Sequence, residues 1–320
     1  MLILDSPSRV PQFNIAAEEY LLKETRQDYA FFYINDPSII VGKHQNAWAE
    51  INLQWTRKNN IPVVRRISGG GTVWHDEGNL NFSFILNGEE GKLVNFREYA
   101  SPVLDFLVKL GIPAEFGQRN EMLVGGLKIS GNAEHVYRRR VLHHGTLLFS
   151  SDLSRLSQAL ETDPEQYKDK AVQSVRSKTG NIKDFLKEDM GIVEFRKLLL
   201  GHVFDSYKGS EIHTFSDSDI SRIEELVREK YSLWKWNVGY SPRYSLKREI
   251  RIGDIRVLVE LKVEKGQIKD CRIEGDISDL KDLAIQLTGV AHDPDTIRDL
   301  LWDRNLVKPE WIDIFVGGLF

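Results

Sequence analysis

One stretch of the sequence decides the fold: RRISGGGTVWHD, which runs from Arg65 to Asp76. Three consecutive glycines between β-like segments are costly to order, so a plain linker explains them poorly. Glycines let a ligand approach backbone N–H groups, and Arg65 and Arg66 offer fixed positive charge to a phosphate or a carboxylate. The segment alone therefore favours an anion-binding loop over a glycine-rich hairpin with solvated arginines. Its spacing is neither that of a Walker loop, because no Gly-Lys-Ser/Thr follows, nor that of a dinucleotide-binding fingerprint.

A second glycine-flanked segment, GLKISGNA, runs from Gly126 to Ala133. Strand alternation places Lys128 and Ser130 on one face and turns Leu127 and Ile129 into the core. A lysine held over a packed strand in this way could reach a phosphate as a point charge. Judged alone, it is more often an ordinary exposed strand lysine, so this segment gains weight only beside the first.

The patterns around these two segments predict alternating strands and helices. The stretch from Asn79 to Leu86 alternates cleanly between apolar and polar residues, which is typical of a strand with one buried face. The glycine pair Gly125-Gly126 predicts a tight hairpin inside a β-meander. In this half of the chain we expect strands at 30–34, 39–42, 61–67 and 79–86, a meander over 121–150, and helices starting at Asn14 and covering 49–59 and 96–110.

The second half of the chain predicts a change of domain. Helices are expected at 153–160, 192–207 and 219–231, with a polar loop at 168–181. The aromatic, turn-rich segment 234–244 then precedes three strands, at 245–252, 255–263 and 268–273, and two helices, at 278–287 and 294–302. We therefore expect an α+β protein with a mixed-sheet catalytic domain at 1–242 and a small α+β accessory domain at 243–320.

Composition excludes several classes of protein. Of the 320 residues, 41% are apolar and 28% charged, which fits a globular chain with a substantial core. The net charge of −4 disfavours a non-specific nucleic-acid binder. No run approaches 18 apolar residues and the N-terminus lacks a signal-peptide core, so we expect a cytoplasmic protein without a membrane partner. Cys271 is the only cysteine, which excludes an intrachain disulfide and a Cys-rich zinc site.

Three histidines lie near one another in the sequence, at His135, His143 and His144. The adjacent pair would point to opposite sides of a strand and could not easily share one ion. Zinc ligation by these histidines is therefore not expected.

Taken together, these segments resemble the lipoate–protein ligase family. The family motif Arg-Arg-x-Ser-Gly-Gly-Gly-x-Val-x-His-Asp is matched by residues 65–76, and the sequence continues as Gly78-Asn79-Leu80-Asn81. The family motif Lys-x-Ser-Gly-x-Ala is matched from Lys128 to Ala133, and a His-Gly-Thr-Leu-Leu segment from His144 to Leu148. The stretch Gly42-Lys43-His44-Gln45-Asn46 looks like the early Gly-Arg-x-Gln-Asn stretch of the family. The resemblance covers residues from about 10 to 240, and the remainder looks like the accessory domain of the bacterial two-domain ligases.

The resemblance implies an activity and a site. Members use magnesium and ATP to convert lipoate to lipoyl-adenylate, with octanoate left open as a second substrate. They then transfer the lipoyl group to a lysine of a carrier, namely an acyltransferase subunit of 2-oxoacid dehydrogenases or the glycine cleavage H protein. Lys128 would be the catalytic residue, in contact with the lipoyl carbonyl and the phosphate. The residues implied to bind ATP or lipoyl-adenylate are Arg65, Arg66, Ser68, Gly69, Gly70, Gly71, Thr72, Val73, Trp74, His75, Asn79, Lys128, Ser130, Gly131 and His144.

The chain departs from the family pattern at two places. Where members commonly have Arg-Asn-Asp, this chain has Arg119-Asn120-Glu121, so a magnesium ligand at Glu121 would be one methylene longer. Where many have Arg-Ser-Arg-Val-Thr-Asn-Ile, in the loop that covers the adenylate, residues 176–182 are RSKTGNI.

Alternative functions follow from the same resemblance. An octanoyl or lipoyl transferase that works through a cysteine acyl-enzyme needs a thiolate in the catalytic domain, and Cys271 lies in a predicted strand of the small domain. A biotin ligase would carry a different glycine-arginine motif. A transferase that accepts only preformed lipoyl-adenylate, and a non-catalytic module that binds lipoate or the carrier, both stay open.

Overall fold

The computed structural model of the protein describes residues 1–88, 91, 93–275 and 280–320. The chain folds into two compact units. The first unit contains residues 1–43, 62–157 and 174–233, and the second contains residues 44–61, 158–173 and 234–320. Each unit is described by itself below.

A mixed six-stranded sheet forms the framework of the first unit, in the order β10-β11-β6-β2-β1-β13. β1 pairs in parallel with β2 and β13, whereas the remaining neighbours pair antiparallel. The strands are β1 (Leu2–Asp5), β2 (Tyr29–Ile34), β6 (Asn79–Asn87), β10 (Asn132–Tyr137), β11 (Arg140–Leu148) and β13 (Glu211–His213). The predicted α+β class with a mixed sheet is confirmed.

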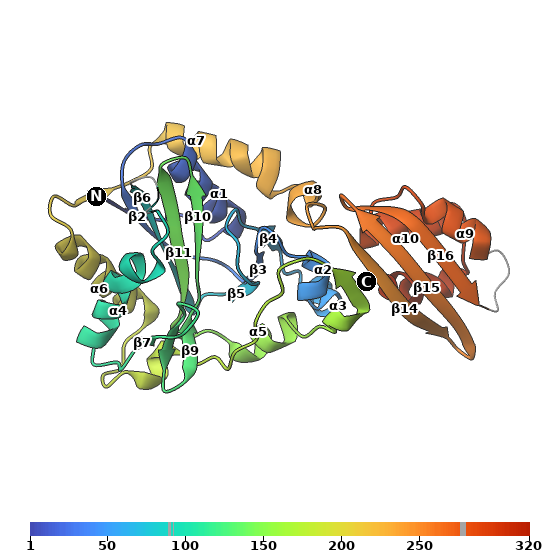
Figure 1. Ribbon diagram of the computed structural model, residues 1–320, viewed down its shortest axis with the longest axis horizontal. Helices are drawn as coiled ribbons and strands as arrows, with labels where there is room; N and C mark the ends of the chain where they lie inside the picture. Colours follow the sequence, from blue (N-terminus) through green and yellow to red (C-terminus); the bar gives the residue numbers. More distant parts are fainter. Residues whose placement is uncertain (89–90, 92, 276–279) are drawn as a thin grey trace. The chain divides into compact units, whose positions relative to one another are not determined.

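Helices cover both faces of this sheet (Figure 1). Leu80, Phe82 and Phe84 of β6 pack into an apolar core with α4 (Phe96–Lys109) and α6 (Ile192–Ser206). On the opposite face, Ser83 donates a hydrogen bond to Glu18 of α1 (Pro11–Lys23). α7 (Asp217–Leu226) and the π-helix η3 (Val227–Tyr231) pack against α1. The predicted alternation of β6 therefore separates an apolar core from a polar layer beneath α1.

Two small sheets position the predicted motifs. β3 (Ser38–Val41) pairs in parallel with β4 (Val63–Arg65) and antiparallel with β5 (Val73–His75), so the glycine run connects the two strands that flank β3. β7 (Glu115–Phe116), β8 (Met122–Val124) and β9 (Leu127–Ser130) form the other sheet. Gly125 and Gly126 have φ angles of +55° and +80°, which confirms the tight hairpin predicted between β8 and β9.

The second unit is built on a separate four-stranded sheet, β12-β14-β15-β16. Its strands are β12 (Tyr167–Asp169), β14 (Tyr244–Ile252), β15 (Ile255–Glu264) and β16 (Gln267–Gly275). Its helices are α2 (Ala47–Glu50), α3 (Leu53–Lys58), α8 (Trp234–Asn237), α9 (Leu280–Leu287), α10 (Pro294–Asp303) and α11 (Ile312–Gly317). The three predicted strands between 245 and 273 are confirmed.

The second unit is larger than the predicted accessory domain, because residues 44–61 and 158–173 belong to it. Trp48 Nε1 donates to the carbonyl oxygen of His292 at 3.1 Å, and the Ala47 N–H donates to Ser241 Oγ at 3.1 Å. The residue pattern along the chain does not reveal contacts between segments so far apart. Because the second unit contains three separate segments, a single boundary at 242/243 does not separate the two units. The family-type boundary at that position stays a prediction.

Several predicted elements differ in extent. α1 begins at Pro11 rather than Asn14, because proline suits the first helical turn, and the Asn14 side chain donates to Asn35 instead of capping the helix. The helix expected over 49–59 is two short helices, since Asn52 caps α3 anew. The strand expected over 61–67 keeps only Val63–Arg65. α5 (Leu153–Ala159), α6 and α7 agree closely with prediction, whereas residues 278–279 of the predicted helix 278–287 lie outside the described residues. None of the helices in the described residues is long and apolar enough to cross a membrane.

Candidate active site

The Arg66 side chain organises the glycine run from within. Its guanidinium donates to the carbonyl oxygens of Ile40 at 3.1 Å, Gly69 at 2.5 Å and Gly71 at 2.8 Å. Its Nε donates to Ser68 Oγ at 2.9 Å. Burial lowers the pKa of Arg66 to about 10, although the nearby Glu18 works in the opposite direction. Arg66 thus brings a buried positive charge to the loop and fixes the loop's carbonyls.

Arg65 is fully buried and ties the early motif to the loop. Its guanidinium donates to the carbonyl oxygens of Gly42 at 2.9 Å and Lys43 at 3.2 Å. The Lys43 N–H donates to the carbonyl oxygen of Ser68 at 2.8 Å. The segment at Gly42-Lys43, singled out from the sequence, therefore lies against the glycine run.

Two of the three glycines, Gly70 and Gly71, occupy positions where a side chain would fit poorly. Gly70 has a φ of +85°, and a Cβ there would lie 3.0 Å from Arg66 Nη2. A Cβ on Gly71 would lie 2.9 Å from Ser174 Oγ. Gly69 meets nothing within 4 Å, so its backbone is open on that side. Neighbouring groups of the protein therefore approach Gly70 and Gly71 closely, and the approach of a ligand to this backbone stays a prediction.

A chain of buried polar groups links the glycine run to α1. Ser68 Oγ accepts a hydrogen bond from Arg66 Nε, which can only donate, and lies 2.6 Å from His144 Nε2. His144 Nδ1 then carries the hydrogen that Glu18 accepts, with Nδ1 to Oε2 at 2.9 Å. Tyr33 also donates to the Glu18 carboxylate, at 3.0 Å. His144 and Ser68, which belong to two different sequence motifs, are thereby brought together.

Glu18, which anchors this chain, was not identified from the sequence. It is fully buried on a helix whose buried residues are mostly apolar, with Asn14 and Glu19 as the other polar exceptions. A carboxylate at a core-facing helical position is the signal that could have found it, because such a group is rarely buried without partners.

Other residues of the first motif form the scaffold beneath the loop. His75 is buried, its Nδ1 lies 2.9 Å from Asn35 Nδ2, and burial together with the charge of Arg66 lowers its pKa to about 3. Trp74 is buried and donates from Nε1 to Asp76 at 2.9 Å. Asn79 is fully buried and donates to Asn81 at 2.9 Å. The side chains of His75, Trp74 and Asn79 hold the β5–β6 region together. The side chain of Val73, by contrast, is partly exposed.

Lys128 lies on β9 in a polar, largely buried setting. A Cβ on Gly131 would be 3.1 Å from Lys128 Nζ, so the ammonium folds back over that glycine. Burial lowers the pKa of Lys128, Glu121 opposes this change, and Arg119 and Arg66 add to it. A Cβ on Gly70 would lie 3.6 Å from the Cβ of Ala133, so the glycine run and the motif that contains Lys128 lie against each other. Ile129 belongs to the core as predicted, while Ser130 is buried and its Oγ has no hydrogen-bond partner among the described residues.

The backbone next to Lys128 is held on two sides. The Gly131 N–H donates to Thr146 Oγ1 at 3.2 Å. The Lys128 N–H donates to the carbonyl oxygen of Lys178 at 2.8 Å, and the Gly180 N–H donates to the carbonyl oxygen of Lys128 at 3.1 Å. The polar loop expected over 168–181 therefore contains a stretch that pairs in parallel with β9 at Lys128.

The described side chains offer few ligands for a permanently bound metal ion. Among the described residues, no group of three or more His, Cys, Asp or Glu side chains could hold one. His143 and His144 do point to opposite sides of β11, the former toward Glu134 at 3.0 Å. Glu121 accepts the Arg119 N–H at 2.8 Å and is about 13% exposed, which leaves one partly accessible carboxylate beside Lys128.

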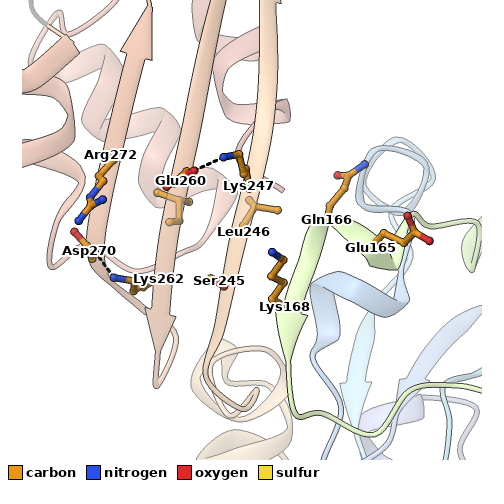
Figure 2. A pocket seen from close by; sticks show the side chains of 11 residues that line it. Glu165, Gln166, Lys168, Ser245, Leu246, Lys247, Glu260, Lys262, Asp270 and Arg272 are labelled. Atoms are coloured by element: carbon orange, nitrogen blue, oxygen red, sulfur yellow. Dashed lines mark hydrogen bonds and ion pairs between the residues drawn. The ribbon is translucent and has the colours of Figure 1, made fainter.

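Two features of the second unit do not supply the chemistry. Burial raises the pKa of the Cys271 thiol to about 12, so it is a poor nucleophile. A groove of about 450 Å³ crosses the face of the four-stranded sheet (Figure 2). Its charges are largely paired across the strands, with Lys247 Nζ 2.5 Å from Glu260 and Lys262 Nζ 2.7 Å from Asp270. None of the residues that line it belongs to the predicted motifs.

Comparison with known proteins agrees with this geometry. The family model described as the lipoyl protein ligase A/B catalytic domain matches residues 10–204, and that of the bacterial lipoate protein ligase C-terminus matches residues 241–309. The chain is 37% identical to lipoate-protein ligase LplJ of Bacillus subtilis, over 98% of this chain and 99% of that protein. It is 41% identical to lipoate–protein ligase 1 of Staphylococcus aureus, over 92% of each.

A solved structure of lipoate-protein ligase A bound with ATP is also similar, with a TM-score of 0.63 and 28% identity over 75% of this chain and 98% of that one. The glycine run, the Lys128 strand and the buried relay all lie within the segment that matches the catalytic-domain family model. The chain therefore belongs to the lipoate–protein ligase family.

Proposed function

We propose that this protein activates lipoate with ATP to form lipoyl-adenylate and then transfers the lipoyl group to a specific lysine of a lipoyl-carrier protein. The observation that carries the proposal is the contact between the motif that contains Lys128 and the Arg66-centred glycine run, where a Cβ on Gly70 would lie 3.6 Å from Ala133 Cβ. Family membership supports the reaction class, and the ATP-bound relative supports the nucleotide.

In the first half-reaction, a lipoate carboxylate oxygen attacks the α-phosphorus of ATP. The new bond joins that oxygen to phosphorus, and the bond from phosphorus to the departing diphosphate breaks. Negative charge builds on the phosphate oxygens, so preorganised cations and N–H donors are the groups that accelerate this step. Lys128 supplies the cation and the backbone of Gly70 to Thr72 supplies the donors, while Arg66 holds that backbone in shape.

In the second half-reaction, the neutral amine of the carrier lysine forms a bond to the lipoyl carbonyl carbon. The bond from that carbon to the phosphate oxygen breaks, AMP departs with the bonding electrons, and the proton lost by the amine passes to water. Lys128 polarises that carbonyl, because its ammonium reaches both the acyl oxygen and the phosphate. The lowered pKa of Lys128 reflects its partial removal from water, which strengthens its interaction with developing charge. Neither half-reaction requires a cysteine.

Magnesium fits this site as the companion of ATP. Magnesium is usually held by one or two carboxylates together with substrate phosphates, and Glu121 offers one carboxylate beside Lys128. The ion would neutralise phosphate charge; the chain's own part is the Glu121 carboxylate, fixed by the Arg119 N–H.

The decisive experiment measures diphosphate release from ATP with lipoate, with and without an unlipoylated carrier domain, and repeats it with octanoate. We expect lipoate-dependent diphosphate release and ATP-dependent lipoylation of the carrier. Carrier lipoylation only from chemically made lipoyl-adenylate would instead identify a transferase that lacks the activation step. Binding of lipoate without either reaction would identify a non-catalytic module.

A further inference from the structure

The β10–β11 hairpin runs from the candidate active site to a turn that carries an exposed arginine. β10 is an edge strand of the six-stranded sheet (Figure 1). It starts beside the glycine run, where Ala133 lies against Gly70. The turn between the two strands has only two residues, and the first of them is Arg138. At about 3.3 Å per residue, Arg138 lies roughly 17 Å along the strand from Ala133.

Arg138 occupies a backbone position that favours glycine. Its φ is +55°, and positions of this kind in two-residue hairpin turns are usually filled by glycine, asparagine or aspartate. The side chain is exposed, and its guanidinium makes no ion pair with the residues that the structure describes. A charged side chain at a strained position, without a partner in its own chain, indicates a role other than holding the fold.

Two lysines lie close to Arg138 around a shared tyrosine and a shared carboxylate. Lys23 Nζ and Arg138 Cζ lie 5.3 Å and 5.2 Å from the centroid of the Tyr137 ring. Lys23 Nζ and Lys230 Nζ each lie 2.6 Å from a different carboxylate oxygen of Glu19. We call Lys23, Arg138 and Lys230 the basic patch. Glu19 balances only part of its charge, so the patch keeps an excess of positive charge.

The buried arginine at the start of β11 holds the patch together. Arg140 Nη2 donates to the carbonyl oxygens of Leu21 at 3.2 Å and Gln27 at 2.7 Å, which lie on either side of the end of α1. Arg140 Nη1 donates to Asn87 Oδ1 at 3.0 Å. The hairpin and the end of α1 are thereby fastened to each other. Cations from both elements are held in place in advance, which reduces the cost of ordering them when an anionic partner binds.

The basic patch lies within the area that a docked carrier would cover. A standard interface buries about 800 Å² on each partner, which corresponds to a round area roughly 32 Å across. A carrier that presents its lysine beside Lys128 therefore reaches the far end of β10. The protein as a whole has a net charge of −4, so attraction to an acidic partner has to come from a local group of cations. Arginine binds carboxylates particularly well, because its planar fork matches their two oxygens.

We propose that the basic patch docks the lipoyl-carrier protein by binding carboxylates on the carrier surface around its target lysine. The inference rests on the proposed transfer of the lipoyl group to a carrier, and it adds the surface chemistry by which the carrier is recognised. The patch orients the carrier and speeds its association. Charges at the rim of an interface act mainly in this way, and salt screens their effect.

The test compares Arg138→Gly and Arg138→Glu with Lys197→Glu, a matched control. Lys197 is exposed on α6, which covers the opposite face of the six-stranded sheet. The probe is an unlipoylated lipoyl domain of a 2-oxoacid dehydrogenase acyltransferase subunit. We expect Arg138→Gly to raise the KM for this domain by roughly twofold to fivefold, the range that one exposed ion pair represents. Arg138→Glu should raise it by about tenfold or more, because attraction becomes repulsion.

Two further readouts separate docking from a merely structural role. Arg138→Gly should be at least as stable as the parent protein in urea unfolding, because glycine suits a φ of +55°. This variant also keeps the test valid if Arg138→Glu folds poorly. The difference in KM between Arg138→Glu and the parent protein should shrink at about 0.5 M salt. kcat for transfer should change by less than about twofold, since the patch acts before the chemical step.

Each other outcome has a definite meaning. A KM for the lipoyl domain that is unchanged in both Arg138 variants, while the parent protein lipoylates that domain, overturns this inference alone. Equal increases in Arg138→Glu and Lys197→Glu also overturn it, because net charge would then explain the effect. Loss of binding to duplex DNA or to phosphatidylglycerol vesicles in Arg138→Glu, with an unchanged KM for the lipoyl domain, would assign the patch to a different partner. A parent protein that neither releases diphosphate with lipoate nor lipoylates the domain overturns the proposed function, and this inference with it.

Discussion

Replacing Glu18 by glutamine tests the buried relay between α1 and the glycine run. Glutamine has nearly the same shape and keeps one oxygen for Tyr33 and Ser83. Its amide nitrogen, however, takes the place of Oε2, which lies 2.9 Å from His144 Nδ1, and the oxygen that remains, 3.0 Å from Nδ1, no longer carries a carboxylate charge. The charge-assisted hydrogen bond is lost, which costs about 1.5–3 kcal/mol in a buried setting.

We expect Glu18→Gln to lower the free energy of unfolding by about 2 kcal/mol, measured by urea unfolding followed by circular dichroism. The matched control is Glu24→Gln, because Glu24 pairs with Arg222 at the surface, where the two side chains are 34% and 36% exposed. Such a pair is worth at most about 1 kcal/mol. Nitrogen chemical shifts would show the hydrogen of His144 moving from Nδ1 to Nε2. A Glu18→Gln protein with parental stability and the hydrogen still on Nδ1 would refute the relay.

Four further predictions address the site and the second unit. Lys128→Ala should fold normally, and the rates of adenylate formation and of transfer should each fall by about 10²- to 10³-fold. Lys128→Arg should also lose most of its activity, because a planar guanidinium does not replace a compact ammonium. Near-normal rates in both assays would contradict the assignment of Lys128. Gly70→Val should weaken ATP and lipoate binding at least tenfold in calorimetry, since its Cβ would lie 3.0 Å from Arg66 Nη2 on a backbone with φ of +85°; unchanged affinities would reduce the glycines to a turn. Cys271→Ser should retain parental lipoylation rates, and a loss beyond tenfold in a folded variant would revive an acyl-enzyme route. Burial lowers the pKa of His292 from 6.5 to about 4, so the free energy of unfolding should decrease as the pH falls from about 6.5 through 4. His292→Gln should reduce this decrease, measured by urea unfolding at pH 7 and pH 4.5. An equal decrease in the variant and the parent protein would contradict the prediction.

The sequence predicted the elements that local patterns encode. The alternation of Asn79 to Leu86 gave β6, and the glycine pair Gly125-Gly126 gave the hairpin before Lys128. What it did not predict depends on partners far along the chain. The sequence suggested Asn14 as a helix cap. In the structure α1 begins at Pro11, and Asn14 lies within that helix, where its side chain donates a hydrogen bond to Asn35.

The same limit applies to the site. The resemblance of the motifs to the family identified Arg66, Ser68 and His144 as candidate site residues. The spacing of these residues did not show that the Arg66 guanidinium donates hydrogen bonds to carbonyl oxygens of the glycine run. Glu18 lies outside the motifs and meets His144 across 126 residues of sequence. Ser174 falls in a polar stretch with no periodicity, so only the folded structure shows its contact with Thr72.

The interleaving of the two units constrains how the protein is made. Residues 44–61 leave the ribosome early, but Trp48 bonds His292, which follows 244 residues later, and packs against Phe320 with ring centroids 5.3 Å apart. At about 5–20 residues per second, synthesis delays these contacts by roughly 10 to 50 s. During that interval the Trp48 indole, which is 7% exposed in the finished fold, has no cover from its own unit's later residues. For most of its synthesis, a nascent chain of this protein therefore carries Trp48 without the partners that cover it in the finished fold.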